Sequence, residues 1–271
     1  MDDPMVLLRG AEPVLAAAAA KLVALQHGPL RTERKDLLDV VTEADLAAEE
    51  IVVEGLTRLT PNAAILAEER GASAGGSDGR WIIDPLDGTV NYATGLPWFS
   101  VTAAYEVGGE VQVGLTHAPS VPLIARYVRD RLATVDGRPV QARATRSLAD
   151  AVVSVCLTSH FSPEDVRRTA AIVARLGGLA RGVRVVVSGG LELALVAAGR
   201  LDGFVSIKAD VVSHATGVAL VRAAGGRVST LGGTDATLDD LEKIASAPAI
   251  HDELLAVIRD ALGERATGPT T

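Results

Sequence analysis

Two aspartates and a glycine–threonine step lie close together in the segment Trp81–Tyr92, which reads Trp-Ile-Ile-Asp-Pro-Leu-Asp-Gly-Thr-Val-Asn-Tyr. Asp84 and Asp87 flank a tight turn at which their carboxylates can converge, and carboxylate oxygens are the ligands that Mg²⁺ prefers. Gly88 and Thr89 add backbone N–H groups and a hydroxyl, which suit a bound phosphate. Asp-Pro and Asp-Gly pairs are also ordinary turn formers. Because both carboxylates and the Gly-Thr step occur together in one short turn, the pattern favours a metal and phosphate site over a plain turn.

Further carboxylates come shortly before this segment, at Asp45 and at the pair Glu68-Glu69. Taken singly, Asp45 could be a helix-capping residue and the glutamate pair a solvated strand end. Together with Asp84 and Asp87, they supply enough oxygen ligands for one or two Mg²⁺ ions. A site of this kind activates water and neutralises the oxygens of a phosphoryl group in transfer. The acidic residues therefore predict phosphoryl chemistry.

The composition excludes several classes of protein. The chain has 271 residues, is 48% hydrophobic and only 3% aromatic, and carries a formal net charge of −8. The acidic balance and the lack of a basic run argue against binding to nucleic acid or to an anionic membrane. The single cysteine, Cys156, cannot form an intrachain disulfide and is expected to be a buried small hydrophobe. No signal peptide or transmembrane run is apparent, so a cytoplasmic location is expected.

The elements that must position these residues differ between the two halves of the chain. Residues 1–150 are expected to form an α+β half that carries the metal and phosphate motifs. Thr42 followed by Asp45 predicts a capping box at a helix start, and Asp84-Pro85 is expected to end a buried strand at Ile83. Gly108-Gly109 predicts a hairpin turn. The expected elements are helices at 12–25 and 43–59, loops at 31–36 and 71–79, strands at 63–67, 99–107 and 110–117, and a further strand or pair within 123–135.

Residues 151–271 are expected to form an α/β half that packs closely against the first as one unit. Strands and helices alternate along this half, which indicates a mostly parallel sheet. The expected strands are 151–157, 183–188 and 203–207, the expected helices are 163–176, 191–198 and 213–224, and the tail 263–271 is expected to be frayed.

Several segments resemble, in order, the signatures of the inositol monophosphatase family, which are Mg²⁺-dependent, lithium-sensitive phosphatases. The early segments are Asp39–Asp45, Ala67–Glu69 and Trp81–Tyr92, and the later ones are 188–202, 215–226 and 244–251. The resemblance covers nearly the whole chain, and the Asp-Pro-Leu-Asp-Gly-Thr motif is its most specific part. It implies an α+β fold, a layered α/β/α/β/α sandwich of the inositol monophosphatase and sugar phosphatase type, and a homodimer.

The resemblance also implies roles for individual residues. Glu69, Asp84 and the Leu86 carbonyl would hold a first Mg²⁺, while Asp84 and Asp87 would bridge toward a second. Asp45 and Thr89, with Glu69 also counted as catalytic, would orient the attacking water and help to deprotonate it. The residues implied to contact substrate are Gly88, Thr89, Gly189, Gly190 and Ser206.

The chain departs from the family pattern at a few positions. Ser213 stands where the family has a metal-binding aspartate that opens a helix; serine is a good N-cap but a much poorer Mg²⁺ ligand. Asp210, three residues upstream, could substitute only if the loop were remodelled. Ala67 stands where the family has glycine, and Ser206 where inositol-specific members often have an acidic residue.

Two functional hypotheses follow. The first is an Mg²⁺-dependent phosphomonoesterase that hydrolyses a small polyol phosphate, similar to inositol monophosphate, by direct attack of metal-activated water. Related members act on histidinol phosphate, nucleotide 3′-phosphates or fructose bisphosphate, and the residues do not choose firmly among them. The alternative is a catalytically impaired or repurposed member, in which Ser213 has removed turnover and the pocket binds a ligand or performs other chemistry. His117 and His214 are expected to be strand-end or helix-surface residues.

Overall fold

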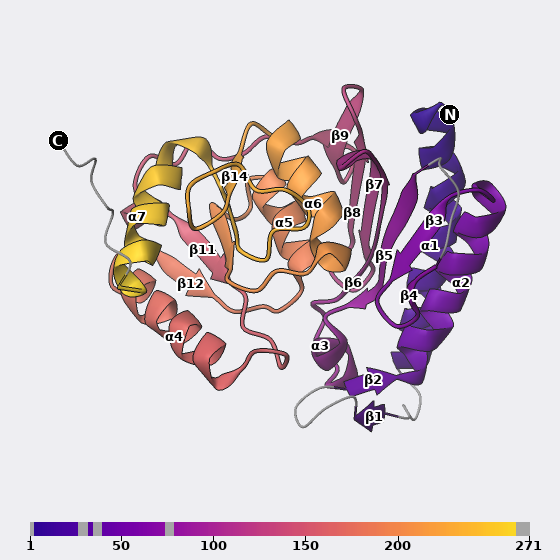
Figure 1. Cartoon of the computed structure of the whole chain (residues 1–271), viewed down its shortest axis with the longest axis horizontal. Coiled ribbons are helices and arrows are strands. Elements are labelled where there is room, and N and C mark those ends of the chain that lie inside the picture. Colours follow the sequence, from indigo (N-terminus) through magenta and orange to yellow (C-terminus); the bar gives the residue numbers. More distant parts are fainter. Residues whose placement is uncertain (1–2, 27–31, 35–39, 74–78, 264–271) are drawn as a thin grey trace.

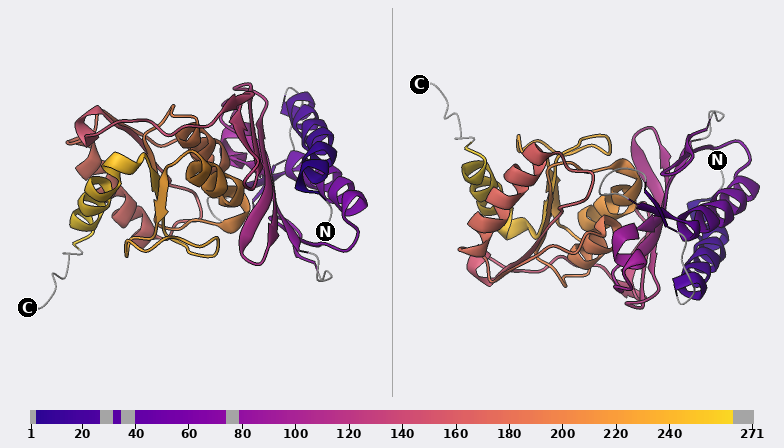
Figure 2. Two further views of the ribbon diagram at one scale, coloured as in Figure 1. Left: turned by 90° about the horizontal axis from the view of Figure 1, so that it is seen from above. Right: turned by 90° about the horizontal axis from the view of Figure 1, so that it is seen from below.

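A computed structural model describes residues 3–26, 32–34, 40–73 and 79–263. Helices and sheets alternate in five layers (Figures 1 and 2), as the predicted α/β/α/β/α sandwich requires. An outer pair of helices covers a large sheet, a central pair separates it from a smaller sheet, and a further pair covers the outside of the smaller sheet. Asp39 of the first motif lies outside the described residues, as do 27–31, 35–38, 74–78 and 264–271.

The larger sheet has eight strands in the order β10-β9-β8-β7-β6-β5-β3-β4. All neighbouring pairs are antiparallel except β3 with β5. The predicted hairpin at Gly108-Gly109 is confirmed, since both glycines have positive φ, at 62° and 84°. The strands are β3 (Ala64–Ala67), β4 (Gly71–Ala72), β5 (Arg80–Asp87), β6 (Ser100–Val107), β7 (Glu110–Ala118), β8 (Leu123–Val128), β9 (Leu132–Val135) and β10 (Arg138–Pro139).

Strand β5 continues through Pro85 to Asp87, so the prediction that Asp84-Pro85 ends the strand is wrong. Asp84 pairs with Thr102 and Asp87 with Ser100, so three steps along β5 oppose two along β6. This extra residue is a β-bulge, where proline is tolerated because the ladder needs no amide from it. The bulge bends the end of the strand and changes the direction in which the side chains of the two aspartates point.

Short segments predicted as loops take part in pairing. Gly71–Ala72 forms β4 beside β3, although the run 71–79 was expected to be a loop. Within the predicted loop 31–36, β1 (Thr32–Arg34) pairs antiparallel with β2 (Val40–Thr42). These segments form strands because their backbones hydrogen-bond to a neighbouring strand, which their polar sequence does not indicate.

The smaller sheet is mixed rather than mostly parallel. Its order is β12-β11-β13-β15-β14, with parallel pairs on either side of β11 and antiparallel pairs on either side of β15. The predicted strand 183–188 is also wrong beyond Arg184, because Val187 adopts a positive φ and the chain turns into a helix. The strands are β11 (Val152–Val155), β12 (Gly182–Arg184), β13 (Gly203–Ser206), β14 (Arg227–Ser229) and β15 (Lys243–Ser246).

The five predicted helices are confirmed except at some of their ends, and two further helices, at 89–93 and 251–261, were not predicted. Helix α2 has the predicted capping box, in which Thr42 and Asp45 satisfy each other's backbone amides. Helix α1 begins at Pro4 rather than at residue 12, since Asp3 accepts from the Met5 amide and Pro4 needs no donor in the first turn. The helices are α1 (Pro4–Gln26), α2 (Glu43–Leu59), α3 (Thr89–Ala93), α4 (Pro163–Gly177), α5 (Gly189–Ala197), α6 (Val211–Ala223) and α7 (His251–Ala261), with 3₁₀ turns at Leu148–Asp150 and Pro248–Ile250.

The central helices α5 and α6 pack closely and position the site. The α-carbon of Gly217 faces Leu193, so a β-carbon at 217 would collide with that side chain. α6 contacts β5, β6 and β7 of the larger sheet, while α5 contacts β13 and β15 of the smaller one. The N-termini of both helices meet the end of β5. In the described ranges, no helix has the combination of length and apolar character needed to cross a bilayer.

Candidate active site

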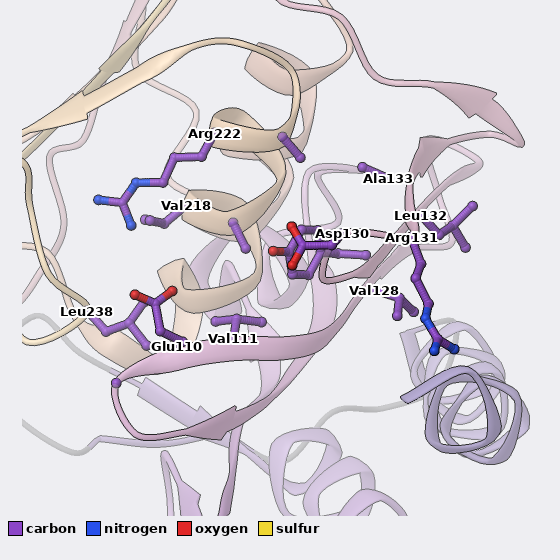
Figure 3. Close-up of a pocket in the computed structure, with 14 residues that line it drawn as sticks. Glu110, Val111, Val128, Asp130, Arg131, Leu132, Ala133, Val218, Arg222 and Leu238 are labelled. Atoms are coloured by element: carbon purple, nitrogen blue, oxygen red, sulfur yellow. The ribbon is translucent and has the colours of Figure 1, made fainter. Parts of the chain in front are cut away.

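An acidic cavity of about 240 Å³ lies where β5 ends against α3, α5 and α6. Its walls include the carboxylates of Glu68, Asp84, Asp87 and Asp210. A larger cavity of about 440 Å³ lies at the far end of α6, against β7 and the β8–β9 turn (Figure 3). The side chains of its acidic residues, Glu110 and Asp130, are 61% and 92% exposed, so water screens their charges. The smaller cavity holds the buried carboxylates and is the candidate site.

Asp84 is buried at the bulge and is held by two donors from the protein. Its Oδ1 accepts from the Leu86 amide over 3.0 Å, and its Oδ2 accepts from the Ser213 hydroxyl over 2.7 Å. Burial and the nearby carboxylates of Glu68, Asp87 and Asp210 raise the pKa of Asp84 well above its usual range. The local charge is therefore strongly negative when these groups are ionised.

Asp87 is fixed by a larger set of donors, which the sequence did not reveal. Its Oδ2 accepts from Ser100 Oγ over 2.8 Å and from Ser188 Oγ over 2.7 Å. The amide of Gly190 donates to the same oxygen over 3.0 Å, so the start of α5 also faces this carboxylate. Burial raises the pKa of Asp87 to about 6 in spite of these donors. Serines do not stand out in a sequence, and only the fold brings residues 100 and 188 to one carboxylate.

Asp45 and Thr89 come together as the resemblance implies. The Thr89 hydroxyl lies 3.0 Å from Asp45 Oδ1 and 3.0 Å from the Leu86 carbonyl oxygen. The other oxygen of Asp45 accepts from the amide and the hydroxyl of Thr42. Burial raises the pKa of Asp45. Asp45 thus combines its helix-capping function with a position beside the site, so the two interpretations of this residue are compatible.

The glutamate pair divides its side chains between two environments. Glu68 lines the cavity and raises the pKa of Asp84, whereas Glu69 is not among the residues that line it. Glu69 lies close enough to Asp45 to raise its pKa, and its amide donates to Glu49 Oε2 over 2.9 Å. Both residues lie in the turn between β3 and β4, and the sequence alone could not show which of the two side chains faces the cavity.

The start of α6 differs from the prediction. Asp210, and not Ser213, is the N-cap: its Oδ1 accepts from the Ser213 amide over 2.7 Å. Ser213 is therefore in the first turn, where its hydroxyl reaches Asp84. Asp210 and Ser213 both line the cavity, and Asp210 lies near enough to raise the pKa values of Asp84 and Asp87.

The remaining predicted substrate contacts are only partly in the cavity wall. Gly88, Thr89 and Gly189 line it, while the Gly190 amide is engaged by Asp87. Ser206 is buried and does not line the cavity. His214, expected on a helix surface, is instead buried in α6, lines the cavity and stacks edge-on against Phe204 at 5.3 Å. Cys156 is buried as expected.

The donor set suits a hard divalent cation. Lysine and arginine are absent from the described residues that line the cavity, and the basic side chains in its wall are those of His160 and His214. Oxygen ligands and uncompensated negative charge are what Mg²⁺ requires. Across the described ranges, however, no three His, Cys, Asp or Glu side chains lie close enough to make a ready-formed metal cluster. The carboxylates therefore share a cavity without yet converging on one point.

Comparison with known proteins decides the family. A family model described as the inositol monophosphatase family matches residues 6–263. The chain belongs to the inositol monophosphatase family. The resemblance noted in the sequence is thereby confirmed, and the five-layer architecture is the fold of this family.

Relatives within the inositol monophosphatase family include proteins of different names. An inositol-1-monophosphatase ImpA from Mycolicibacterium smegmatis is 34% identical over 255 residues, which cover 93% of this chain and 92% of the relative. A Nus factor SuhB from Pasteurella multocida is 35% identical and covers 87% and 88%. The solved structure of a Thermotoga maritima IMPase matches with a TM-score of 0.85 and 31% identity over 93% of this chain and 96% of that one.

Proposed function

We propose that this member of the inositol monophosphatase family is an Mg²⁺-dependent phosphomonoesterase that acts on a small polyol phosphate. The observation that carries the proposal is the bulged turn at Asp84–Thr89, which places two buried carboxylates and the Thr89 hydroxyl in one cavity. Names given to relatives, such as inositol-1-monophosphatase, support this class of substrate. We further propose that the protein is cytoplasmic and that it forms a homodimer. Light scattering on the purified chain would test the oligomeric state.

We propose Glu68, Asp84, Asp87, Asp210 and the Leu86 carbonyl as the residues that hold Mg²⁺. Glu68 and Asp210 are preferred because both line the cavity and both raise the pKa of Asp84. Glu69 is assigned instead to the surroundings of Asp45. When bound, Mg²⁺ supplies Lewis acidity and neutralises the charge of the phosphoryl group.

The protein's own residues supply the proton chemistry and the positioning. Thr89 donates its hydroxyl proton to Asp45, so its oxygen is left free to accept a hydrogen bond from an attacking water. Asp45 has a raised pKa and can take up a proton relayed through Thr89. Gly88 has φ 93°, and a β-carbon there would lie 2.7 Å from the Trp98 carbonyl oxygen, so only glycine fits at this point of the cavity wall.

The proposal is tested with Asp84→Asn, which keeps the size of the side chain and removes its charge. Changes to groups that only support metal ligands already cost about 10–100-fold, so loss of a direct ligand is expected to lower kcat/KM by at least about 100-fold. Asp130→Asn is the matched control, since Asp130 is exposed, lies outside the site, and has φ 56°, which asparagine tolerates. Phosphate release from a panel of small phosphomonoesters, with Mg²⁺ titrated, is the measurement. Wild-type turnover in Asp84→Asn would refute the proposal.

The catalytically impaired or repurposed alternative rests on Ser213. It predicts no phosphate release at any Mg²⁺ concentration from the wild-type protein, with release restored by Ser213→Asp. A panel that shows release from the wild type excludes it.

A further inference from the structure

The first turn of α5 is capped by a residue from a different segment of the chain. Ser188 is the N-cap by position, yet its side chain accepts no hydrogen bond from the helix. Serine N-caps ordinarily accept from the second or third amide of a helix. Here the amides at these positions, Gly190 and Leu191, donate instead to Asp87 Oδ2 over 3.0 and 3.4 Å. Asp87, at the end of β5, therefore caps α5, and the Ser188 hydroxyl is free to make another contact.

The Ser188 hydroxyl donates to the same oxygen of Asp87. Oδ2 thus accepts from the hydroxyls of Ser188 and Ser100, over 2.7 and 2.8 Å, as well as from the two amides of α5. Among the described residues none donates to Oδ1, and this atom is not one of the buried polar atoms that lack a partner, so it is exposed to the cavity that Asp87 lines. The protein therefore anchors Oδ2 and leaves Oδ1 open for a cation.

Glu192 of α5 holds the backbone of the residue that carries this hydroxyl. Glu192 is fully buried and is not among the described residues that line the cavity. Its Oε2 accepts from the Ser188 amide over 3.0 Å, and the Val186 amide donates to the same carboxylate. Its Oε1 accepts from the Ser154 hydroxyl. The carboxylate thus fixes the amides of the chain segment that leads into α5.

The same segment is held from its carbonyl side by Asn91 of α3. The Asn91 side-chain amide donates to the carbonyl oxygen of Val186 over 2.8 Å and to that of Val187 over 3.2 Å. Val187 has φ 62°, which a β-branched residue rarely adopts and which persists only where the surroundings over-determine the conformation. The backbone before Ser188 is therefore held in a strained conformation by contacts on both sides, and this conformation directs the Ser188 hydroxyl to Asp87.

Stability alone does not account for a glutamate at position 192. All three groups that donate to Glu192 are neutral, and burial together with the nearby charge of Asp87 raises the pKa of Glu192 to about 7. A buried carboxylate that no cation balances lowers the stability of a fold. Both oxygens of a carboxylate accept hydrogen bonds, whereas a glutamine side chain has only one acceptor oxygen. Holding three donors at once is what a glutamate does here and a neutral side chain of the same size does not.

We propose that Glu192 is a positioning residue for the metal site. By holding the Ser188 amide, it directs the Ser188 hydroxyl and the start of α5 to Asp87 Oδ2, so that Oδ1 is presented to the cation. The inference deepens the proposed function and rests on it for the identity of the cation, Mg²⁺. Loss of the Glu192 carboxylate should let the strained turn at Val187 relax and leave Asp87 less firmly oriented. Cation binding is then weakened although every proposed ligand is still present.

The inference is tested by calorimetric titration of the full chain with Mg²⁺ alone. Glu192→Gln should raise the dissociation constant about 10–100-fold, the usual effect of changing a group that supports a metal ligand. Glu106→Gln is the matched control, because Glu106 is also buried and accepts from a backbone amide, that of Gly109, at the opposite end of β6 from Ser100. The control should lower the melting temperature and leave the dissociation constant unchanged. A wild-type dissociation constant in Glu192→Gln, or an equal rise in both variants, would overturn the inference.

The route through Ser188 is tested with Ser188→Ala, which removes one of the hydroxyl donors from Asp87 Oδ2. Residues within one hydrogen-bond network are not additive in their effects. If Glu192 acts through Ser188, the rise in the dissociation constant of the double variant is smaller than the product of the two single rises. A double variant that shows the full product would mean that the two side chains act independently, and it would overturn the inference.

Phosphate release from the same proteins separates this inference from the proposed function. Glu192→Gln should raise the Mg²⁺ concentration at half-maximal rate by the same factor as the dissociation constant, with a maximal rate close to that of the wild type. A lower maximal rate at an unchanged half-saturating concentration would show that Glu192 is merely structural. No release from any of the proteins, with the calorimetric differences intact, would sink the phosphatase function and leave the positioning role standing. Failure of the wild type to bind Mg²⁺ would overturn both.

Discussion

The hydroxyl of Ser213 donates a 2.7 Å hydrogen bond to Asp84, so the first turn of α6 stabilises the ionised form of this carboxylate without supplying a positive charge. Asp210, one turn earlier, caps the same helix and brings a carboxylate to the cavity. A carboxylate from the second half of the chain therefore lines the cavity, three residues before the position at which the family pattern has one.

Ser213→Asp should destabilise the protein without metal. The new carboxylate would lie against Asp84 and Asp210 in a buried place, and we expect a loss of about 2 kcal/mol in the free energy of unfolding. Mg²⁺ should reverse the loss and stabilise the variant more than the wild type, because it would bind the folded form more tightly. Denaturant titrations with and without Mg²⁺ measure both effects. Equal stability in the two metal-free proteins would show that residue 213 does not face the acidic cluster.

Thr89→Val should lower kcat by about 10²–10⁴-fold, because it removes the hydroxyl that links the attacking water to Asp45. Thr89→Ser keeps the hydroxyl and is expected to retain most of the activity. Steady-state phosphate release at saturating Mg²⁺ compares the two variants. Equal losses in both would mean that the threonine methyl group, and not the hydroxyl, matters.

The affinity for Mg²⁺ should fall as the pH decreases through about 6, the raised pKa of Asp87. Protons compete with the cation for this carboxylate, so metal binding releases protons in that range. The stability of the metal-free protein changes with pH in the opposite direction. Because burial raises the pKa of Asp87 from 3.8, its contribution to stability is fully present below pH 3.8 and is lost as the pH rises through about 6. Calorimetric Mg²⁺ titrations at pH values on either side of 6 test the prediction; a constant affinity would contradict it.

His251 should make the folded protein less stable in mild acid. Its ring is buried between Ser246 Oγ and Ser229 Oγ, each 2.9 Å away, and burial lowers its pKa from 6.5 to about 4. A depressed histidine pKa contributes stability above pH 6.5 that is lost as the pH falls toward 4. The loss is at most about 1.4 kcal/mol per pH unit. Unfolding of the wild type and of His251→Gln across this range should show a steeper pH dependence in the wild type.

The sequence by itself determined the family, the order of most elements and the segment around which the site is built. Local patterns carried this information: the Thr42–Asp45 capping box, the glycine hairpin at 108–109, and a motif whose residues are adjacent in the chain. Such features depend on backbone geometry over a few residues, so they can be predicted from the sequence without knowledge of the fold.

Only the tertiary structure decided which side chains share the cavity. It chose Glu68 over Glu69 for the wall, made Asp210 the cap of α6, and brought Ser100 and Ser188 to Asp87. It also carried β5 through Pro85 by means of a bulge against β6. These outcomes depend on side-chain direction and on pairing between distant segments. Neither is encoded in a run of neighbouring residues, because a shift of one residue along an extended chain moves a side chain to the opposite face.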